Sequence, residues 1–348
     1  MNPGELARKP GEWLRGTGPE SDIVISCRVR LARNVANYPF SVRLSASERA
    51  DIHRRLRDVI LAEEISTPEM YLELTDAGEL ERTLLVERHL ISREHSDGGG
   101  RRGVAVGEGE VVSVMVNEED HLRIQVMKSG LQLREAWALC NGTDDRIEAH
   151  VEYSFDKELG YLTACPTNVG TGMRASVMMH LPALVITRQI AKVFQAASKM
   201  NLAVRGLYGE GTEATGHFYQ ISNQSSLGRT EEQILSTIEK VIPQIVRYER
   251  SARGSLMAKD RLRLEDRVWR AYGMLRYARM VSSEETLQLL SAVRMGVQLG
   301  MLDAPDSKRL NALVLETQPA HLQVLHGGEL SPEERDRVRA EYLKSMMN

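Results

Sequence analysis

Apolar residues recur with two different periods along this chain, and the period changes near Arg253. Before that point, short segments rich in β-branched residues alternate with polar positions, whereas helical spacing dominates after it. Strands are expected at residues 22–29, 83–90, 111–116, 122–127, 151–155, 202–205 and 218–221. Consecutive strands joined by short turns predict an α+β fold, in which a large, mostly antiparallel sheet is flanked by helices.

Helix starts are marked by capping residues. Ser45 with Glu48, and Thr230 with Gln233, form the pattern of a capping box, and apolar spacing continues from each. Further helices are expected at 183–198, 257–277, 283–299, 307–315 and 332–344. We therefore expect an N-terminal arm at 1–21, a catalytic domain at 22–253 and a small all-helical domain at 254–348. A glycine-rich segment at 96–103 is expected to be a flexible loop without core residues.

Composition and charge exclude several classes of protein. With 42% hydrophobic and 27% charged residues, the chain is neither fibrous nor disordered. Its net charge of -3 gives no overall attraction to nucleic acid or to an anionic membrane. The apolar run 181–186 is too short to span a bilayer, and the start of the sequence lacks the pattern of a signal peptide. These features predict a cytoplasmic location, with no direct contact to nucleic acid or membrane. The three cysteines form no CxxC pair, so neither a disulfide framework nor a zinc site is expected.

Arginines recur at the ends of the expected strands, although the sequence contains no GxxxxGK[ST] phosphate-binding loop. The set comprises Arg28, Arg30, Arg123, Arg174 and Arg205. Arg28 and Arg30 are two residues apart on a strand, so both point to one face. A guanidinium group suits phosphate oxygens, although a single such arginine is more often solvated or paired with an acid.

Three further segments combine turn residues with reactive side chains. Residues 117–121 form an acidic turn between two apolar strands, which composition alone favours as a solvated hairpin tip. Residues 165–176 begin with Cys165 and are interpreted as a loop that ends one strand and begins a helix running through Val177. Residues 205–214 contain three glycines and Glu210, and are interpreted as a mobile loop bringing that acid into a site.

Together these segments resemble the catalytic signature of the phosphagen kinases, the creatine and arginine kinase family. The matching motifs are Ser-x-Arg-x-Arg at 26–30, Asn-Glu-Glu-Asp-His-Leu-Arg at 117–123, Cys-Pro-Thr-Asn-x-Gly-Thr at 165–171 and Arg-Gly-x-x-Gly-Glu at 205–210. The resemblance implies ATP and Mg²⁺, with Glu119 and Glu210 holding and deprotonating a guanidinium and Cys165 beside it. It also implies a nucleotide site built from Ser26, Cys27, Arg28, Val29, Arg30, His89, Arg123, Arg174, Ala175, Ser176, Val177, Met178, Arg205, Gly206, Leu207, Tyr208, Gly209 and Glu210.

The arrangement along the chain is similar to that of bacterial protein arginine kinases of the McsB type. Here 25 residues precede Ser26, whereas kinases of small guanidino compounds carry a helical domain there that closes over the substrate. An open pocket would admit an arginine presented by another protein. The last part of the chain matches that family's phosphoarginine-binding motif, with Arg335, Asp336, Arg337, Val338, Arg339 and Ala340. Arg335 and Arg339 are four apart and share a helix face.

The resemblance implies phosphorylation of arginine side chains in a stress response, marking proteins for Clp degradation. Implied partners are a transcription repressor, a zinc-containing activator and the Clp unfoldase-protease, and the chain is expected to form a homo-oligomer. Two alternatives remain open. The chain would phosphorylate a small free guanidino metabolite, or it would be a catalytically weak adaptor that binds the repressor and the unfoldase. The intact Glu119, Glu210 and arginine set count against the adaptor.

Overall fold

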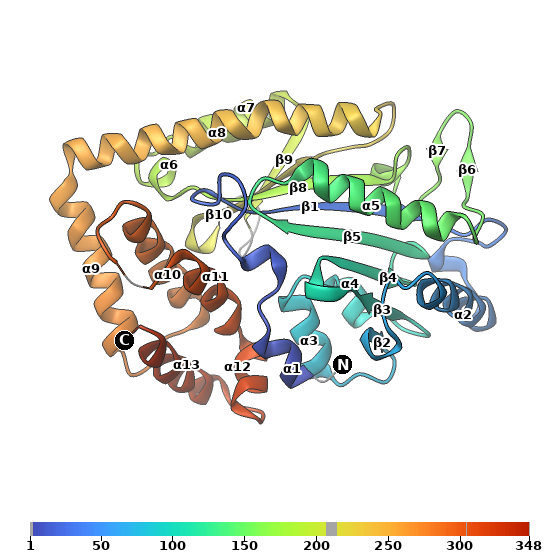
Figure 1. Cartoon of the computed structure of the whole chain (residues 1–348), viewed down its shortest axis with the longest axis horizontal. Helices are drawn as coiled ribbons and strands as arrows, with labels where there is room; N and C mark the ends of the chain where they lie inside the picture. Colours follow the sequence, from blue (N-terminus) through green and yellow to red (C-terminus); the bar gives the residue numbers. More distant parts are fainter. Residues whose placement is uncertain (1–2, 207–213, 304, 348) are drawn as a thin grey trace.

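The computed structural model describes residues 3–206, 214–303 and 305–347, and its central feature is an eight-stranded sheet (Figure 1). Neighbouring strands follow the order β2-β3-β4-β5-β1-β8-β10-β9, and every pair is antiparallel. The strands are β1 (Val24–Arg33), β2 (Tyr71–Glu73), β3 (Gly103–Val106), β4 (Val112–Val116), β5 (Leu122–Ser129), β8 (Met173–His180), β9 (Leu202–Gly206) and β10 (Phe218–Asn223). The sheet confirms the expected fold class.

Helices pack on both faces of this sheet (Figure 1). They are α1 (Pro3–Arg8), α2 (Ala46–Ala62), α3 (Glu79–Glu87), α4 (Arg93–Asp97), α5 (Leu133–Glu148), α6 (Pro182–Ile186), α7 (Ile190–Lys199), α8 (Glu231–Lys259), α9 (Arg261–Tyr277), α10 (Ser283–Gln298), α11 (Ser307–Glu316), α12 (Pro319–His326) and α13 (Pro332–Met346). Both predicted capping boxes are present, at Ser45 and at Thr230. Among the described residues, no helix is long and apolar enough to cross a membrane.

The two faces of the sheet have different partners, because side chains alternate along each strand. Val29 of β1 and Val177 of β8 lie in the main core together with Ile238 of α8. The opposite face contributes Ile25 and Met178 to a second core, which includes Trp13 of the N-terminal arm and apolar residues of α9–α11 and α13. The helical region therefore covers part of the face from which Arg28 and Arg30 also project.

One predicted strand is wrong. Residues 83–90 lie mostly in helix α3, which begins after Gly78 and has Glu79 and Glu81 in its first turn. Leu84 and Leu85 are both buried. A helix allows this, whereas a strand with one face exposed to solvent would expose one of the two side chains. Acidic residues near a helix N-terminus are favoured by the helix dipole. A short apolar run cannot by itself distinguish a strand from a buried helix.

The segment after Cys165 also differs from the prediction. It does not begin a helix there, because residues 173–180 form β8, which lies between β1 and β10 in the sheet. The expected helix at 183–198 is divided into α6 and α7 near Arg188, whose φ of 58° cannot continue a helix. The strand expected at 151–155 is reduced to a single bridge between Tyr153 and Val35, followed by the two-residue strands β6 (Phe155–Asp156) and β7 (Gly160–Tyr161).

Helix α8 is continuous through Arg253, where the period of apolar residues changes, and ends at Lys259. Arg253 is buried and donates to Glu249 at 2.9 Å, and that carboxylate in turn accepts from the backbone N–H groups of Ala183 and Leu184 at the start of α6. The glycine-rich segment is also more ordered than expected. Arg102 within it is buried and donates to backbone carbonyls of α4.

Candidate active site

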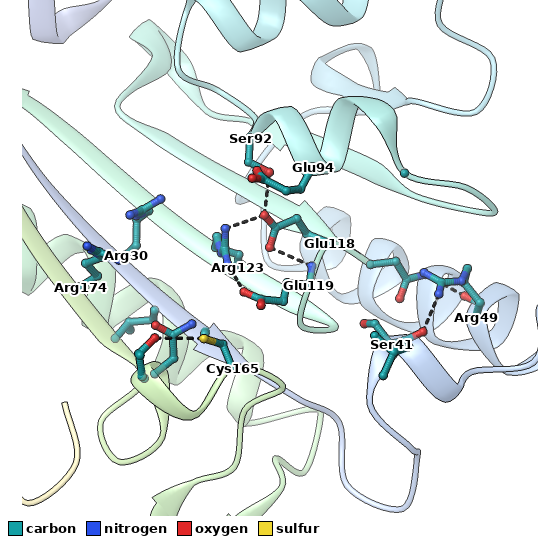
Figure 2. A pocket seen from close by; sticks show the side chains of 18 of the residues that line it. Arg30, Ser41, Arg49, Ser92, Glu94, Glu118, Glu119, Arg123, Cys165 and Arg174 are labelled. Atoms are coloured by element: carbon teal, nitrogen blue, oxygen red, sulfur yellow. Dashed lines mark hydrogen bonds and ion pairs between the residues drawn. The ribbon is translucent and has the colours of Figure 1, made fainter. Parts of the chain in front are cut away.

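Two adjoining cavities, of about 630 and 810 Å³, lie against the sheet face that carries the arginines. They share Arg30, Ser92, Arg174 and Arg205 in their walls. The first cavity also contains Glu119 and Cys165 (Figure 2). Together the two cavities form a groove with an arginine-lined middle, which is the geometry that a reaction between two bound substrates requires.

The arginine row is built by strand pairing. Arg30 of β1 lies opposite Arg174 of β8 in the register, so the two side chains leave the sheet side by side (Figure 2). Arg28 projects from the same face and donates from Nη2 to Oε1 of Gln220 at 3.0 Å. Arg123 reaches the cavity from β5 on the other side of β1. The predicted common face of Arg28 and Arg30 is confirmed.

Burial and mutual repulsion disturb these guanidinium groups. Burial, together with the charges of Arg174 and Arg123, lowers the pKa of Arg28 to about 10. The pKa of Arg30 is also lowered by burial and by the neighbouring arginines, and the pKa of Arg174 by burial and by Arg205. The buried Nε of Arg174 has no hydrogen-bond partner among the described residues. A row of crowded cations with an unused donor is chemically suited to binding a polyanion.

His89 lies next to this row, at the far wall of the larger cavity. Its ring contacts Trp13 edge-on, with 5.3 Å between the ring centroids, and its backbone has a φ of 59°. Burial, together with the charges of Arg28 and Arg30, lowers the pKa of His89 to about 3. The imidazole is therefore neutral at physiological pH and adds no further cation to the row.

The acidic turn at 117–121 is not a solvated hairpin tip, because four of its five residues, Asn117, Glu118, Asp120 and His121, are buried. Asp120 is fully buried and accepts hydrogen bonds from Nδ2 of Asn34 and from the backbone N–H of Ala164, both at 2.7 Å. His121 accepts from the N–H of Val35 through Nδ1, so its Nε2–H donates to the carbonyl of Pro39. These contacts connect the turn to the segment that follows β1 and to the residue before Cys165.

Glu118 and Glu119 are adjacent acids with different surroundings (Figure 2). Glu118 is buried, forms an ion pair with Nη1 of Arg123 at 2.5 Å and accepts from Oγ of Ser92 at 2.6 Å. Glu119 keeps a side chain that is 44% exposed, with one oxygen 3.3 Å from Nη2 of Arg123. Burial raises the pKa of Glu119, Arg123 lowers it, and the neighbouring acids Asp120, Glu118 and Glu94 raise it. Glu119 is thus an accessible carboxylate with an increased affinity for a proton.

Cys165 faces Glu119 across the smaller cavity (Figure 2). The cysteine is partly exposed, and its Sγ lies 3.0 Å from Oγ1 of Thr167. The loop that follows passes close to β1 at Gly172, which has a φ of 65°; a Cβ there would lie 2.5 Å from the carbonyl oxygen of Ala32. Glycine at this position lets the loop and β8 pack directly against the strand that carries Arg30.

The other predicted nucleotide-site residues separate into three groups. Ser26, Ser176 and Met178 lie on the groove face of the sheet and line a small hollow beside Arg28 and His89, and Gly206 lines the larger cavity. Four residues have side chains in the main core on the opposite face, away from the groove: Cys27, Val29, Ala175 and Val177. Leu207, Tyr208, Gly209 and Glu210 lie outside the described residues, so the structure does not place the second predicted catalytic acid.

Sequence reasoning missed several residues that line or organise the groove. Glu118 and Ser92 fix Arg123, and Gln125 and Gln220 flank Arg28 from β5 and β10. The two glutamines had a detectable signal, because each is a polar residue in an apolar strand on the same face as a predicted arginine. Ser92 had none, because its segment was not assigned to any element.

The C-terminal motif lies on α13. Arg339 is buried, donates from Nε to the carbonyl of Thr317 at 2.8 Å and from Nη1 to the carbonyl of Val281 at 2.9 Å. The same Nη1 is 2.6 Å from Asp336. Arg335 is half-buried and Arg337 is exposed, whereas Ala340 is buried. Arg339 therefore anchors α13 to the segments that precede α10 and follow α11.

Comparison with known families gives matches over most of the chain. Residues 51–252 match the model described as ATP:guanido phosphotransferase, C-terminal catalytic domain, and residues 261–348 match the protein-arginine kinase McsB C-terminal domain. A protein-arginine kinase of Symbiobacterium thermophilum is 49% identical over 347 residues, covering 99% of this chain and 98% of the relative. The protein-arginine kinase of Bacillus subtilis is 46% identical over 338 residues, covering 97% and 93%.

Solved structures of phosphagen kinases share the fold. The duplicated taurocyamine kinase from Schistosoma mansoni, with bound transition-state analogue components, superimposes with a TM-score of 0.60 at 29% identity, over 72% of this chain and 36% of that one. Lombricine kinase gives a TM-score of 0.60 at 24% identity, over 72% and 71% of the two chains. Each of these structures therefore shares the fold over about three quarters of this chain.

Proposed function

This chain belongs to the protein-arginine kinases of the ATP:guanido phosphotransferase family, and from that premise we propose how its groove performs the reaction. The reaction is ATP + protein L-arginine → ADP + protein N-phospho-L-arginine. The strongest support for assigning it to this groove is the meeting of two cavities at a wall that contains Arg30, Arg174 and Arg205. One cavity would hold the nucleotide and the other the acceptor arginine.

The larger cavity would bind ATP, with its phosphates along the arginine row. Arg28, Arg30, Arg174 and Arg205 would contact the phosphates, and His89 would lie beside the nucleotide. Phosphoryl transfer needs positive charge around the transferring group and little covalent chemistry from the protein. Crowded guanidinium groups with lowered pKa values support this role, because a bound polyanion would relieve their mutual repulsion.

The smaller cavity would bind the acceptor guanidinium between Glu119 and Cys165. A guanidinium with a pKa above 12 is not a nucleophile until a positioned base removes a proton. Glu119 would accept a proton from the attacking nitrogen while that nitrogen forms a bond to the γ-phosphorus. The bond from this phosphorus to the bridging oxygen breaks, and its electron pair leaves on ADP. We assign the second carboxylate role to Glu210 from the motif alone.

Mg²⁺ would enter with ATP. Among residues 3–206, 214–303 and 305–347, no three His, Cys, Asp or Glu side chains cluster as a metal site. In kinases Mg²⁺ is commonly held by substrate phosphate oxygens and water together with one or two carboxylates, so the phosphates of ATP would supply part of its coordination here. When bound, Mg²⁺ would neutralise phosphate charge, while the arginine row orients the phosphates.

We further propose that the helical region, residues 254–348, contains a separate phosphoarginine site on α13. The half-buried Arg335 would contact the phosphate, Asp336 would offer a carboxylate to the ligand's guanidinium, and the exposed Arg337 would add positive charge nearby. Arg339 would hold Asp336 and helix α13 in place and would not contact the ligand, because its Nε and Nη1 already bind backbone carbonyls and Asp336. Val338 and Ala340 belong to the same motif, and the buried Ala340 would lie beneath the site.

The wider role we propose is a cytoplasmic stress response in which arginine phosphorylation marks proteins for Clp degradation. Partners would be a stress-gene repressor, a zinc-containing activator and the Clp unfoldase-protease, and the chain would form a homo-oligomer. Exposed aromatic and aliphatic side chains on α9 support protein contacts of this kind; Leu262 is 79%, Trp269 54% and Tyr277 68% exposed.

The reaction is tested by incubating the full chain with ATP and an unfolded arginine-containing protein. We expect acid-labile phosphate on arginine, detected by mass spectrometry under neutral conditions. The matched control is the same substrate with every arginine replaced by lysine, which keeps the charge and removes the acceptor. Equal labelling of both substrates, or label that survives acid treatment, would contradict the proposed reaction.

A further inference from the structure

A hydrogen-bonded network of three buried side chains and the half-buried His217 joins the helical region to the catalytic sheet, and no step proposed above uses it. Arg294 and Ser291 lie on α10, while His180 ends β8 and His217 immediately precedes β10. Nη1 of Arg294 is 3.0 Å from Nδ1 of His180, and Nε2 of His180 is 2.8 Å from Oγ of Ser291. The same Oγ is 3.0 Å from Nδ1 of His217.

The donor and acceptor of each hydrogen bond in this network can be assigned, and every bond is donated in the direction from Arg294 to His217. Arginine can only donate, so Nδ1 of His180 accepts and the proton of this imidazole lies on Nε2. His180 then donates to Ser291, whose single hydroxyl hydrogen remains free to be donated to Nδ1 of His217. Burial and the charge of Arg294 lower the pKa of His180, and burial lowers the pKa of His217 to about 4, so both rings are neutral at physiological pH.

Arg294 is the end of the network that is held most firmly by other hydrogen bonds. It is 1% exposed and also donates to the backbone carbonyls of Ser21 and Asp22 and to Oδ1 of Asn311. These bonds connect α10 and α11 to the residues just before β1. The guanidinium therefore cannot turn away from His180 without breaking contacts to both parts of the molecule.

His217 is the other end, and it sits where β10 begins. Its carbonyl accepts from the N–H of Leu181 at 3.0 Å, and its φ is 61°. The preceding Gly216 lies so close to α10 that a Cβ there would be 2.8 Å from the carbonyl oxygen of Leu287. The start of β10 is thus held between β8 and α10.

Strand β10 in turn determines where Arg205 lies. In the register, Gln220 of β10 faces Arg205 of β9, and Tyr219 faces Gly206. Strand β9 is at the edge of the sheet and pairs with β10 alone among the described strands. A shift of β10 would therefore move Arg205, and would also move Gln220, which binds Arg28 at 3.0 Å.

We propose that Ser291 is a positioning residue for phosphoryl transfer: by donating to His217 it fixes β10 and so aligns Arg205 with the transferring phosphate. The proposal rests on the proposed phosphate contact of Arg205. Ser291 is fully buried on α10 and has no route to either substrate. Its effect would pass through one hydrogen bond between the helical region and the catalytic sheet.

The central experiment compares wild type with Ser291→Ala, measuring kcat and the KM for ATP on one protein substrate. Loss of one buried hydrogen bond should lower kcat about tenfold. The KM should change by less than about twofold, because the binding of ATP by the remaining arginines is unchanged. His217→Asn should retain most of the activity, because its Oδ1 accepts near the position of Nδ1 and asparagine tolerates a positive φ.

A control variant lies on the same helix. Thr286 is also fully buried, but its hydroxyl donates to the carbonyl of Ser282 within α10, at 2.7 Å. Thr286→Val should lower thermal stability while leaving kcat close to wild type. Wild-type kcat in Ser291→Ala would overturn the proposal, as would an equal loss in Thr286→Val.

Two further readouts separate this proposal from the assignment of Arg205. In ¹⁵N spectra, Nδ1 of His217 should appear as an unprotonated acceptor. A protonated Nδ1 would show that Ser291 does not donate to His217, and would overturn the proposal. If Arg205→Ala leaves kcat unchanged, the phosphate contact itself fails. If Arg205→Ala lowers kcat, Ser291→Ala should have a much smaller effect in that background, because only the contact of Gln220 with Arg28 remains to be disturbed. If Ser291→Ala lowered kcat by the same factor in wild type and in Arg205→Ala, the proposal that Ser291 positions Arg205 would be refuted.

Discussion

Replacement of Glu119 by glutamine tests the proposed base with the least disturbance of the site. The amide has the same shape, and its oxygen can still accept from Nη2 of Arg123, now 3.3 Å from the carboxylate. Arg123 should stay in place, because Glu118 holds its Nη1 at 2.5 Å. The substitution therefore removes the proton acceptor and one negative charge, and little else.

The expected loss is at least about 10²-fold in kcat, the usual cost of removing a general base. ATP binding should be unchanged or slightly stronger, because a carboxylate near the phosphates has been neutralised. Burial raises the pKa of Glu119 above that of an ordinary glutamate. The active form is the deprotonated one, so kcat/KM should fall as the pH decreases through this raised pKa. Glu119→Gln should lack that acid limb.

The assay is the initial rate of phosphate transfer to one protein substrate over a range of pH, with ATP affinity measured by calorimetry. Glu94→Gln is the matched control, because Glu94 lines the same cavity and its removal makes the same change in charge. It should alter the rate by less than about threefold, since it raises the pKa of Glu119 only from a distance. If Glu119→Gln kept more than about a tenth of the wild-type rate, Glu119 would not be the base.

Three other outcomes are expected. Arg174→Ala or Arg205→Ala should lower kcat about 10²- to 10³-fold. Lysine should rescue these variants only partly, because it cannot bridge two phosphate oxygens; full rescue at both positions would indicate a general charge effect. A flexible protein should be phosphorylated much faster than free arginine, and equal second-order rates would favour a small-metabolite kinase. Phosphoarginine, titrated by calorimetry, should bind wild type but not the Arg335→Ala, Asp336→Ala double variant; equal binding would place the site elsewhere.

The sequence was most informative where a local period determines the geometry. Spacing by two along β1 was sufficient to place Arg28 and Arg30 on one face, because side chains alternate on any strand. Capping at Ser45 and Thr230 was equally local, since the bonds involve residues three apart. Such features depend on a few neighbouring residues and are not altered by the rest of the fold.

Prediction failed where a tertiary partner decides the structure. Residues 173–180 alternate between groove-facing Arg174 and core-facing Ala175, yet the preceding glycines favoured a loop. Pairing with β1 on one side and β10 on the other makes the segment a strand. Glu118 and Glu119 are adjacent acids with no local difference, and their separation into an ion-pair partner and an accessible carboxylate depends on Arg123 and Ser92. Ser291 and His217 are 74 residues apart, and no periodicity connects them.

The charges of the groove explain how one site can attract both a polyanion and a cation. Arg28 is bound by the neutral Gln220 rather than by an acid, and Arg174 has a buried nitrogen without a partner among the described residues, so this wall keeps its positive charge. Arg123 is the exception, because Glu118 neutralises it at the side where the acceptor guanidinium would enter. Glu119 then adds a negative charge at that end. Negative charge is therefore concentrated near Glu119, and unpaired positive charge along the arginine row, so a guanidinium would be repelled from the row until ATP occupied it.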